Sequence, residues 1–151
     1  MENNLLTDVE IRRVMNRAAG TPATYKADVI VDMAGFDEVT FIAAFQTVVN
    51  DAVVTMRVAH GDTDGTGNMT VSEATLGAIT SDGTTIALSN KSLALAVTKP
   101  KYRYHEIQIV VATQNAPIDG VIAILSKARE KPTTQGATVI DEAIFASPDD
   151  A

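Results

Sequence analysis

The sequence contains no cysteine and no tryptophan, and aromatic residues make up only 5% of its 151 residues. Without cysteine the chain can form neither disulfides nor thiolate metal sites, which fits a reducing compartment. The length suits a single domain, and a domain of this size buries roughly 70% of its unfolded surface and needs no covalent staple.

Positive charge is also scarce, because 12 Lys and Arg residues face 19 Asp and Glu residues and leave a net charge of −7. Such a chain is not expected to bind nucleic acid through phosphate contacts or to seek an anionic membrane. No apolar run approaches the roughly 20 residues of a membrane span, and the N-terminus lacks a secretory hydrophobic region. We therefore expect neither a nucleic-acid nor a membrane partner.

Motifs for catalysis and cofactor binding are missing too. The chain has no nucleophile elbow, no P-loop and no dinucleotide fingerprint. Its two histidines, His60 and His105, fall on separate predicted strands, and no third metal ligand is marked by spacing. The sequence therefore predicts a protein that is not an enzyme and that holds no cofactor.

Strand patterns fill the middle of the chain. Apolar residues recur at a period of two in "EVTFIAAFQTVV" and "KYRYHEIQIVVAT", while "ADVIVDM", "NDAVVTMRVAH" and "SLALAV" also have strand composition. Asp82-Gly83 predicts a hairpin, and the almost wholly apolar "GVIAILSKA" predicts a central strand. Seven or eight short strands without intervening helices predict an all-β antiparallel sandwich, jelly roll or barrel.

The two ends of the chain have a different character from the middle. Residues 1–22 predict a short N-terminal helix or arm, because Thr7 and Glu10 have capping-box spacing and Gly20 and Pro22 stop the pattern. Residues 23–131 form the predicted sandwich domain. Residues 132–151, which contain the apolar stretch "ATVIDEAIFA", predict an extended C-terminal arm that lies along its own domain or reaches a neighbour.

The stretch "DTDGTGNMTVSE", residues 62–73, matches the spacing of an EF-hand calcium loop. Its candidate metal ligands are Asp62, Asp64, Thr66 and Glu73. An EF-hand needs a helix on each side, whereas a strand pattern precedes this stretch and a Gly- and Thr-rich segment follows it. The sequence therefore favours a polar surface loop over a calcium site.

Three further stretches occur in a recognisable order: "DMAGFDEVTFIAAF", then "KPKYRYHEIQIVVATQNAPIDGVIAILSKAREKPTT", then a terminal "SPDD". From about Asp28 to the C-terminus the chain resembles the capsid decoration, or cement, proteins of tailed bacteriophages and prophages. Residues 113–134 carry the most specific part of the resemblance, and "KPKYRYHEI" matches the family's basic-aromatic stretch only partly.

The resemblance implies a jelly-roll β-sandwich with a structural role in the virion. Such a protein is made in the bacterial cytoplasm, binds the exterior of the expanded head, bridges major capsid subunits and acts as a homodimer or homotrimer. The terminal segments 1–19 and 133–151 and the "KYRYH" strand are the predicted contact regions. The candidate contacts with the capsid or a sister subunit are Arg12, Arg13, Arg17, Tyr102, Arg103, Tyr104, Val139, Ile140, Ile144 and Phe145.

Two alternatives remain open from the sequence. One is a carbohydrate-binding jelly-roll module whose Asp62–Glu73 loop holds calcium, although the lack of tryptophan weighs against a stacking platform for sugars. The other is a phage head–tail connector or tail component.

Overall fold

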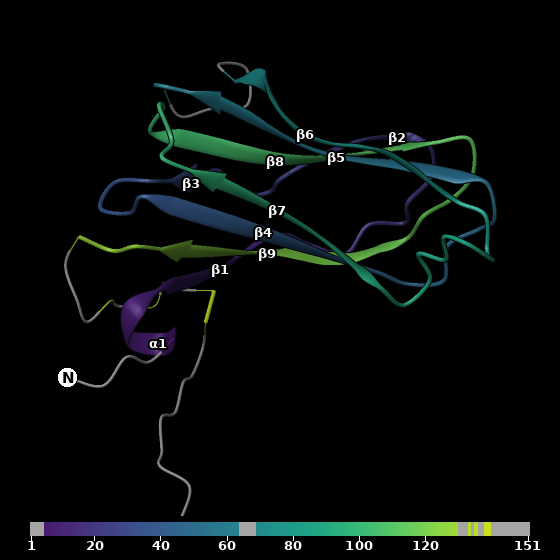
Figure 1. Cartoon of the computed structure of the whole chain (residues 1–151), viewed down its shortest axis with the longest axis horizontal. Coiled ribbons are helices and arrows are strands. Elements are labelled where there is room, and N and C mark those ends of the chain that lie inside the picture. Colours follow the sequence, from purple (N-terminus) through teal and green to yellow (C-terminus); the bar gives the residue numbers. More distant parts are fainter. Residues whose placement is uncertain (1–4, 64–68, 130–132, 134, 136–137, 140–151) are drawn as a thin grey trace, which may run out of the picture.

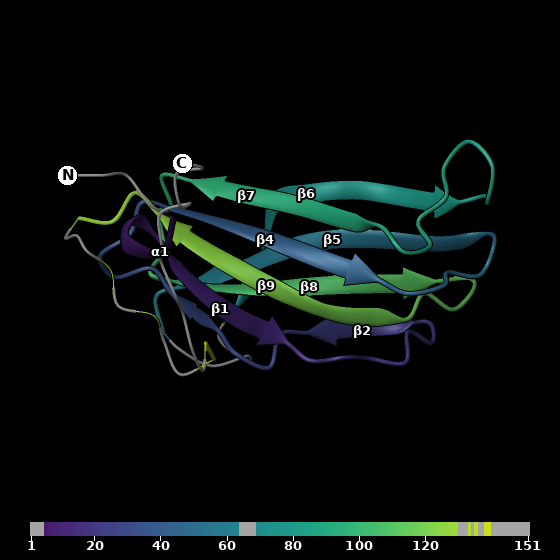
Figure 2. The ribbon, with the colours of Figure 1, turned by 90° about the horizontal axis from the view of Figure 1, so that it is seen from below.

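The computed structural model describes residues 5–63, 69–129, 133, 135 and 138–139. It is a β-sandwich of two antiparallel sheets stacked face to face, as Figures 1 and 2 show. The elements in chain order are α1 Leu5–Asp8, β1 Glu10–Met15, β2 Ala23–Lys26, β3 Val31–Asp32, β4 Glu38–Phe45, β5 Ala52–Gly61, β6 Thr70–Ser81, β7 Ser92–Thr98, β8 Tyr104–Ala112 and β9 Ile118–Ser126.

One sheet, here called sheet A, has the strand order β1-β9-β4-β7. The other, sheet B, has the order β2-β8-β5-β6, and the short β3 also pairs with β8. The chain passes repeatedly from one sheet to the other, so neighbours within a sheet are distant in the sequence, except for the consecutive strands β5 and β6. The all-β antiparallel sandwich predicted from the sequence is confirmed.

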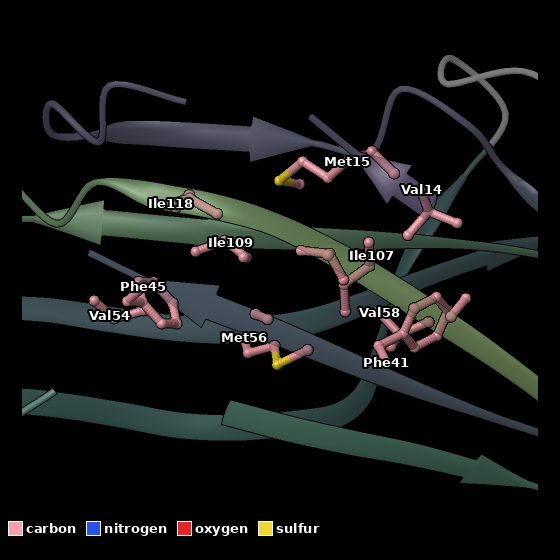
Figure 3. Close-up of a cluster of buried hydrophobic side chains, with 14 of the residues drawn as sticks. Val14, Met15, Phe41, Phe45, Val54, Met56, Val58, Ile107, Ile109 and Ile118 are labelled. Atoms are coloured by element: carbon pink, nitrogen blue, oxygen red, sulfur yellow. The ribbon is translucent and has the colours of Figure 1, made fainter. Parts of the chain in front are cut away.

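The core lies between the sheets and follows directly from the period-two patterns. In β4, Val39, Phe41, Ala43 and Phe45 point inward and are buried, because successive side chains of a strand face opposite sides. Figure 3 shows Phe41 and Phe45 in one buried cluster with Met56 and Ile107 from sheet B. Truncating Phe41 to alanine would cost about 3–5 kcal/mol, because a fully buried ring leaves a cavity.

Most strand predictions hold. β4 and β8 lie within predicted strand segments, and β5, β7 and β9 extend one or two residues beyond theirs. β9 sits between β1 and β4 inside sheet A, as its apolar composition predicted. The predicted strand "ADVIVDM" is wrong in its bounds, because pairing with β8 occurs at β2 and β3 on either side of Ala27–Ile30. The two faces of β8 separate as predicted, but Glu106 and Gln108 on the second face are also buried.

The predicted N-terminal helix is wrong over most of its length. Only Leu5–Asp8 is helical, while Glu10–Met15 forms strand β1 and pairs with β9. Val14 and Met15 reach the core from this strand (Figure 3). Tertiary pairing with a strand from the far end of the chain overrides the local helical pattern. The sandwich therefore includes residues that the sequence had assigned to an N-terminal helix or arm.

The hairpin predicted at Asp82-Gly83 is also wrong. β6 ends at Ser81 in sheet B and β7 begins at Ser92 in sheet A, so residues 82–91 connect the two sheets. The turn chemistry itself is present, because Asp82 Oδ1 accepts hydrogen bonds from the backbone N–H groups of Thr84 and Ile86, and Gly83 has a φ of 78°. Asp82-Gly83 thus begins a crossover and not a two-stranded ribbon.

Candidate functional site

The outer face of sheet A carries mostly apolar side chains at its centre. Side chains that alternate with the core residues of β4, β7 and β9 point away from the sandwich, and the view in Figure 2 looks onto this side. They are almost all small or aliphatic. The central outward residues are Thr40, Ile42, Ala44, Ala94, Ala96, Gly120, Ile122 and Ile124.

Cross-strand pairing joins these residues into continuous rows. Ile42 lies opposite both Ala94 and Ile122, and Ile122 lies opposite Arg13 of β1. Ile42 and Ile122 are 36% and 45% exposed, which is high for isoleucine in a strand. An antiparallel sheet that faces only water normally carries polar residues on that side. Exposed apolar side chains that lie side by side in this way are typical of protein contact surfaces.

Charged residues surround the apolar face without entering its centre. Arg13 stands on the edge strand β1 and Asp119 at one end of β9, while Glu38 and Lys127 form an ion pair of 2.9 Å at the other end. Arg13, Ile42, Ala44, Asp119, Gly120 and Ile122 line a hollow of about 250 Å³ in this face. An apolar centre with a charged rim is the anatomy of a protein–protein interface.

The outer face of sheet B differs sharply from that of sheet A. Arg57 Nε donates a hydrogen bond of 2.9 Å to Gln108 Oε1, and Gln108 Nε2 donates one of 2.8 Å to Glu106 Oε1. This side of the sandwich therefore carries a polar ladder across β5 and β8. Glu106 and Gln108 of this ladder are themselves buried, and Arg57 is half-buried.

The open edge of sheet A, along β1, is bonded by residues from the C-terminal segment. The Ile11 N–H donates to Gln135 Oε1 at 2.7 Å and the Arg13 N–H donates to Thr138 Oγ1 at 3.1 Å. Gln135 Nε2 in turn donates to the carbonyl oxygen of Val9 at 2.9 Å. Side chains thus occupy positions that a further strand would take, which protects an edge from pairing with another chain. These described residues of the predicted arm lie along their own domain.

A second hollow, of about 180 Å³, lies at the end of the sandwich next to His60 and His105. The ring of Tyr102 stacks on that of His60 with centroids 4.2 Å apart, and Lys99 and Lys101 also line the hollow. Burial, and to a smaller extent the neighbouring His60, lowers the pKa of His105 to about 4. His105 is therefore neutral at pH 7. Among the described residues no group of three or more His, Asp or Glu is placed to hold a metal ion.

The basic-aromatic stretch "KPKYRYHEI", residues 99–107, also holds two strands of sheet B together, a role that the sequence did not predict. Arg103 forms two hydrogen bonds of 2.9 Å with Asp32, from Nε to Oδ1 and from Nη2 to Oδ2, which clamps β3 against the start of β8. This pairing lowers the pKa of Asp32. Tyr104 lies beneath the guanidinium of Arg103, with 5.2 Å from Cζ to the ring centroid, and Tyr102 is 37% exposed.

The other predicted contact residues are dispersed. Arg12 pairs with Glu10 at 2.7 Å, Arg13 borders the apolar face, and Arg17 is exposed with a long hydrogen bond of 3.5 Å to Gln46. Val139 is half-buried. Arg12, Arg13 and Arg17 lie in and after β1, whereas the stretch Tyr102–Tyr104 lies just before and at the start of β8, in the other sheet, so the two groups do not form one patch. Ile140, Ile144 and Phe145 lie outside the described residues.

The calcium-like stretch is flanked by strands on both sides. β5 ends at Gly61, just before the exposed Asp62, and Glu73 falls within the backbone of β6. Asp64 and Thr66 lie outside the described residues. Helices that an EF-hand would reorient are therefore replaced by two paired strands of sheet B.

Sequence reasoning missed the apolar face of sheet A. The signal was present, because "TFIAAF", "LALA" and "GVIAIL" are apolar at the outward as well as the inward positions of their strands. Such strands are expected when both faces of a sheet are covered. The continuous apolar run correctly predicted that β9 lies inside a sheet. It did not show that the outward side chains of β9 remain at the surface of the sandwich.

Comparisons with known proteins give little further guidance. No family model matches the chain, and no curated protein matches it. Among solved structures, the chain is similar to Eiger TNF from S. frugiperda, with a TM-score of 0.37 and 11% sequence identity over 84% of this chain and 98% of that one. A likeness this distant bears on neither function nor detail of the fold. The part of the chain that the structure describes contains no helix long and apolar enough to cross a membrane.

Proposed function

We propose that this protein is a structural virion protein that decorates the outside of a tailed-phage capsid and bridges major capsid subunits. The observation that carries the proposal is the outer face of sheet A, whose apolar centre and charged rim are those of a protein-binding surface. The resemblance of residues 28–151 to cement proteins supplies the kind of partner. The net charge of −7 favours a protein partner over nucleic acid.

A jelly-roll topology is part of the same proposal. With β3 set aside, the strand orders β1-β9-β4-β7 and β2-β8-β5-β6 alternate between early and late strands of the chain. This arrangement supports two interlocked Greek keys, which is how a jelly roll is built. It also gives the molecule a rigid body with loops at both ends and broad faces on both sides, suited to lying on a shell.

Stabilisation of the head would follow from mass action. A protein that binds only the assembled and expanded lattice adds its binding free energy to that of the lattice. Repeated attachment at symmetric positions raises the effective concentration of each contact, so individually weak contacts hold the shell together. No chemical step is needed for such a role, and the protein would act wholly through its surfaces.

The test is direct reconstitution. Purified protein is mixed with expanded capsids that lack it, and the particles are imaged by cryo-electron microscopy. We expect extra density of the size of this sandwich at one class of symmetry position on the outer surface, and no such density on unexpanded particles. Bare expanded capsids after incubation at saturating protein concentration would refute the proposal.

A further inference from the structure

We propose that the hollow beside His60 and His105, at the end of the sandwich, binds a small carboxylate group. The hollow measures about 180 Å³ and is lined from both sheets, by the two histidines of sheet B and by Val97 and Thr98 of sheet A. It shares no residue with the hollow in the outer face of sheet A. Binding here is therefore independent of any capsid partner.

Positive charge lines this hollow with no carboxylate to balance it. Lys99 and Lys101 both border it, and neither forms an ion pair with another described residue. The described residues that line it include no Asp and no Glu. Opposite charges attract more strongly where protein excludes part of the solvent, so the hollow favours an anion over a metal cation.

The carboxylates at this end of the sandwich are already engaged by other cations. Three ion pairs, 2.9 to 3.1 Å long, hold them: Arg103–Asp32, Arg129–Asp37 and Lys127–Glu38. A neighbouring hollow of about 220 Å³ is lined by two of these cations, Arg103 and Arg129, whose charges their partners neutralise. Lys99 and Lys101 are therefore left to meet an anion from outside the described part of the chain.

The connection from β7 to β8 fixes the backbone that carries the two lysines. Lys99 has a φ of 49°, in the left-handed region that residues other than glycine seldom adopt. Its N–H donates a hydrogen bond of 3.0 Å to the carbonyl oxygen of Asp37, and the ring of Pro100 restricts the next residue. Backbone in such a conformation persists only where its surroundings hold it, which is common at ligand sites.

The two histidines add polar groups that lack partners. His105 is only 3% exposed, and the Nδ1 atoms of His60 and His105 are buried without a hydrogen-bond partner among the described residues. Buried polar atoms normally have such a partner. The ring of Tyr102 stacks on that of His60 with an interplanar angle of 9°, which fixes one wall of the hollow. A carboxylate oxygen against these rings would supply an acceptor for an imidazole N–H.

The size and the remaining lining of the hollow define the ligand further. A volume of about 180 Å³ is smaller than the pockets that hold drug-sized molecules and has room for about six water-sized groups. Val58, Val97 and Pro100 give it apolar walls, so a short hydrocarbon stem fits beside the carboxylate. So few atoms bind weakly, and we expect a dissociation constant on the order of 1 mM.

NMR titration of the full chain without capsids tests the proposal through the ring signals of His60 and His105, the only histidines. The probe is sodium butyrate, and the control is its neutral amide, butyramide, with chloride keeping the ionic strength constant. We expect butyrate to shift the ring signals saturably and butyramide to leave them unchanged. A third series uses inorganic phosphate, which has no hydrocarbon stem. Phosphate that binds as tightly as butyrate would overturn the assignment to a carboxylate.

The double variant Lys99→Gln/Lys101→Gln should weaken butyrate binding about tenfold or more, because both ammonium groups are lost. The matched control is Lys26→Gln/Lys91→Gln, which removes the same charge from exposed lysines outside the hollow and should change the affinity less than about twofold. Thermal unfolding shows whether each variant folds, and Lys101→Gln alone replaces the double variant if that does not. Absence of any shift with butyrate, or unchanged affinity in the folded lysine variant, would overturn the proposal.

A blocked peptide, acetyl-Gly-Glu-Gly-amide, distinguishes the two sources of such a carboxylate. Its glutamate side chain presents the same group on a similar stem. Binding at least as tight as that of butyrate would assign the site to an acidic segment of a protein, and weaker binding would assign it to a free small acid. Because no capsid is present in any of these titrations, their outcome leaves the decoration proposal to its own test.

Discussion

His60 of β5 and His105 of β8 lie directly opposite each other across sheet B, with ring centroids 6.4 Å apart. The Nδ1 atoms of both rings are buried and have no hydrogen-bond partner among the described residues. A charge on His105 would be costly, because its ring is buried and lies beside His60. His105 therefore makes the sandwich sensitive to acid.

We expect the free energy of unfolding to fall as the pH is lowered from about 6.5 towards 4. The pKa of His105 is lowered to about 4 in the folded chain, whereas an unfolded histidine titrates near 6.5. Between these values the unfolded state binds more protons than the folded state, so stability is lost by up to about 1.4 kcal/mol per pH unit. Urea unfolding at a series of pH values measures the slope.

The variant His105→Asn should flatten this slope above pH about 5, where carboxylates remain ionised. NMR titration of the His105 ring gives its midpoint independently, since His60 is the chain's only other histidine. A midpoint near 6.5, or an equal slope in the variant, would show that His105 is not the group responsible.

Gln135→Ala should destabilise the fold by about 1–2 kcal/mol. The substitution removes the hydrogen bond from the Ile11 N–H and those from Gln135 Nε2 to the carbonyl oxygens of Leu6 and Val9, all partly buried. It also opens the edge of β1 to pairing with other chains, so we expect faster aggregation on heating. Chemical unfolding and light scattering measure the two effects.

Gln114→Ala is the control for this substitution, because Gln114 is exposed between β8 and β9 and its side chain bonds to no described residue.

Removal of residues 133–151 should lower the free energy of unfolding at least as much as Gln135→Ala does, so we expect this segment to contribute to the stability of the sandwich. Equal unfolding midpoints for wild type and truncated chain would contradict this role.

Gly20→Ala should cost about 3 kcal/mol or more, whereas Gly35→Ala should cost about 1 kcal/mol. Both glycines have a positive φ, of 76° and 88°, which L side chains adopt with strain. A Cβ at Gly20 would also overlap the backbone carbonyl of Ala116, while one at Gly35 would meet nothing within 4 Å. The difference in unfolding free energy between the two variants measures the cost of the overlap between the new Cβ at position 20 and the Ala116 carbonyl. Similar costs for both variants would contradict this close approach of the two segments.

Calcium should leave the midpoint of thermal unfolding unchanged. A site with a dissociation constant near 10 µM, within the range of EF-hand sensors, would stabilise the fold by about 2.7 kcal/mol in about 1 mM calcium. The strands β5 and β6 cannot supply the helical geometry of such a site. Scanning calorimetry with calcium, and with magnesium at equal ionic strength, gives the comparison. A rise in the midpoint with calcium but not with magnesium would show that the prediction is wrong and that the Asp62–Glu73 stretch is a candidate calcium site.

Much of the fold could be predicted because its strongest signals are local. The alternation of Val39, Phe41, Ala43 and Phe45 describes β4 and its buried face without reference to any other strand. Fully apolar "GVIAIL" likewise predicts the interior position of β9. Both follow from the simple fact that a strand presents successive side chains to opposite sides.

The errors arose where long-range pairing decides the outcome. Glu10–Met15 has charges that fit a helix, and it becomes a strand only because β9 offers it a partner. Asp82-Gly83 forms its turn locally, but whether the next strand stays in the same sheet depends on the whole sandwich. The pairing of Arg103 with Asp32, 71 residues earlier in the chain, is likewise contained in no local pattern, while the prediction of Arg103 as a contact residue stays a prediction. The apolar face depends on the register of Ile42 with Ile122, which no local pattern contains.

The pairing of β1 with β9 has a consequence for how the chain is made. Glu10 meets Leu125, and β9 also separates β1 from β4, so the first strand to leave the ribosome waits for the last before it can join its sheet. Contacts this distant in sequence make folding slow, on the order of milliseconds to seconds. Until synthesis passes residue 126, sheet A lacks its central strand, and the nascent chain exposes the edge of β4 and the apolar side chains around it. Folding of sheet A is therefore expected to finish only after β9 has left the ribosome.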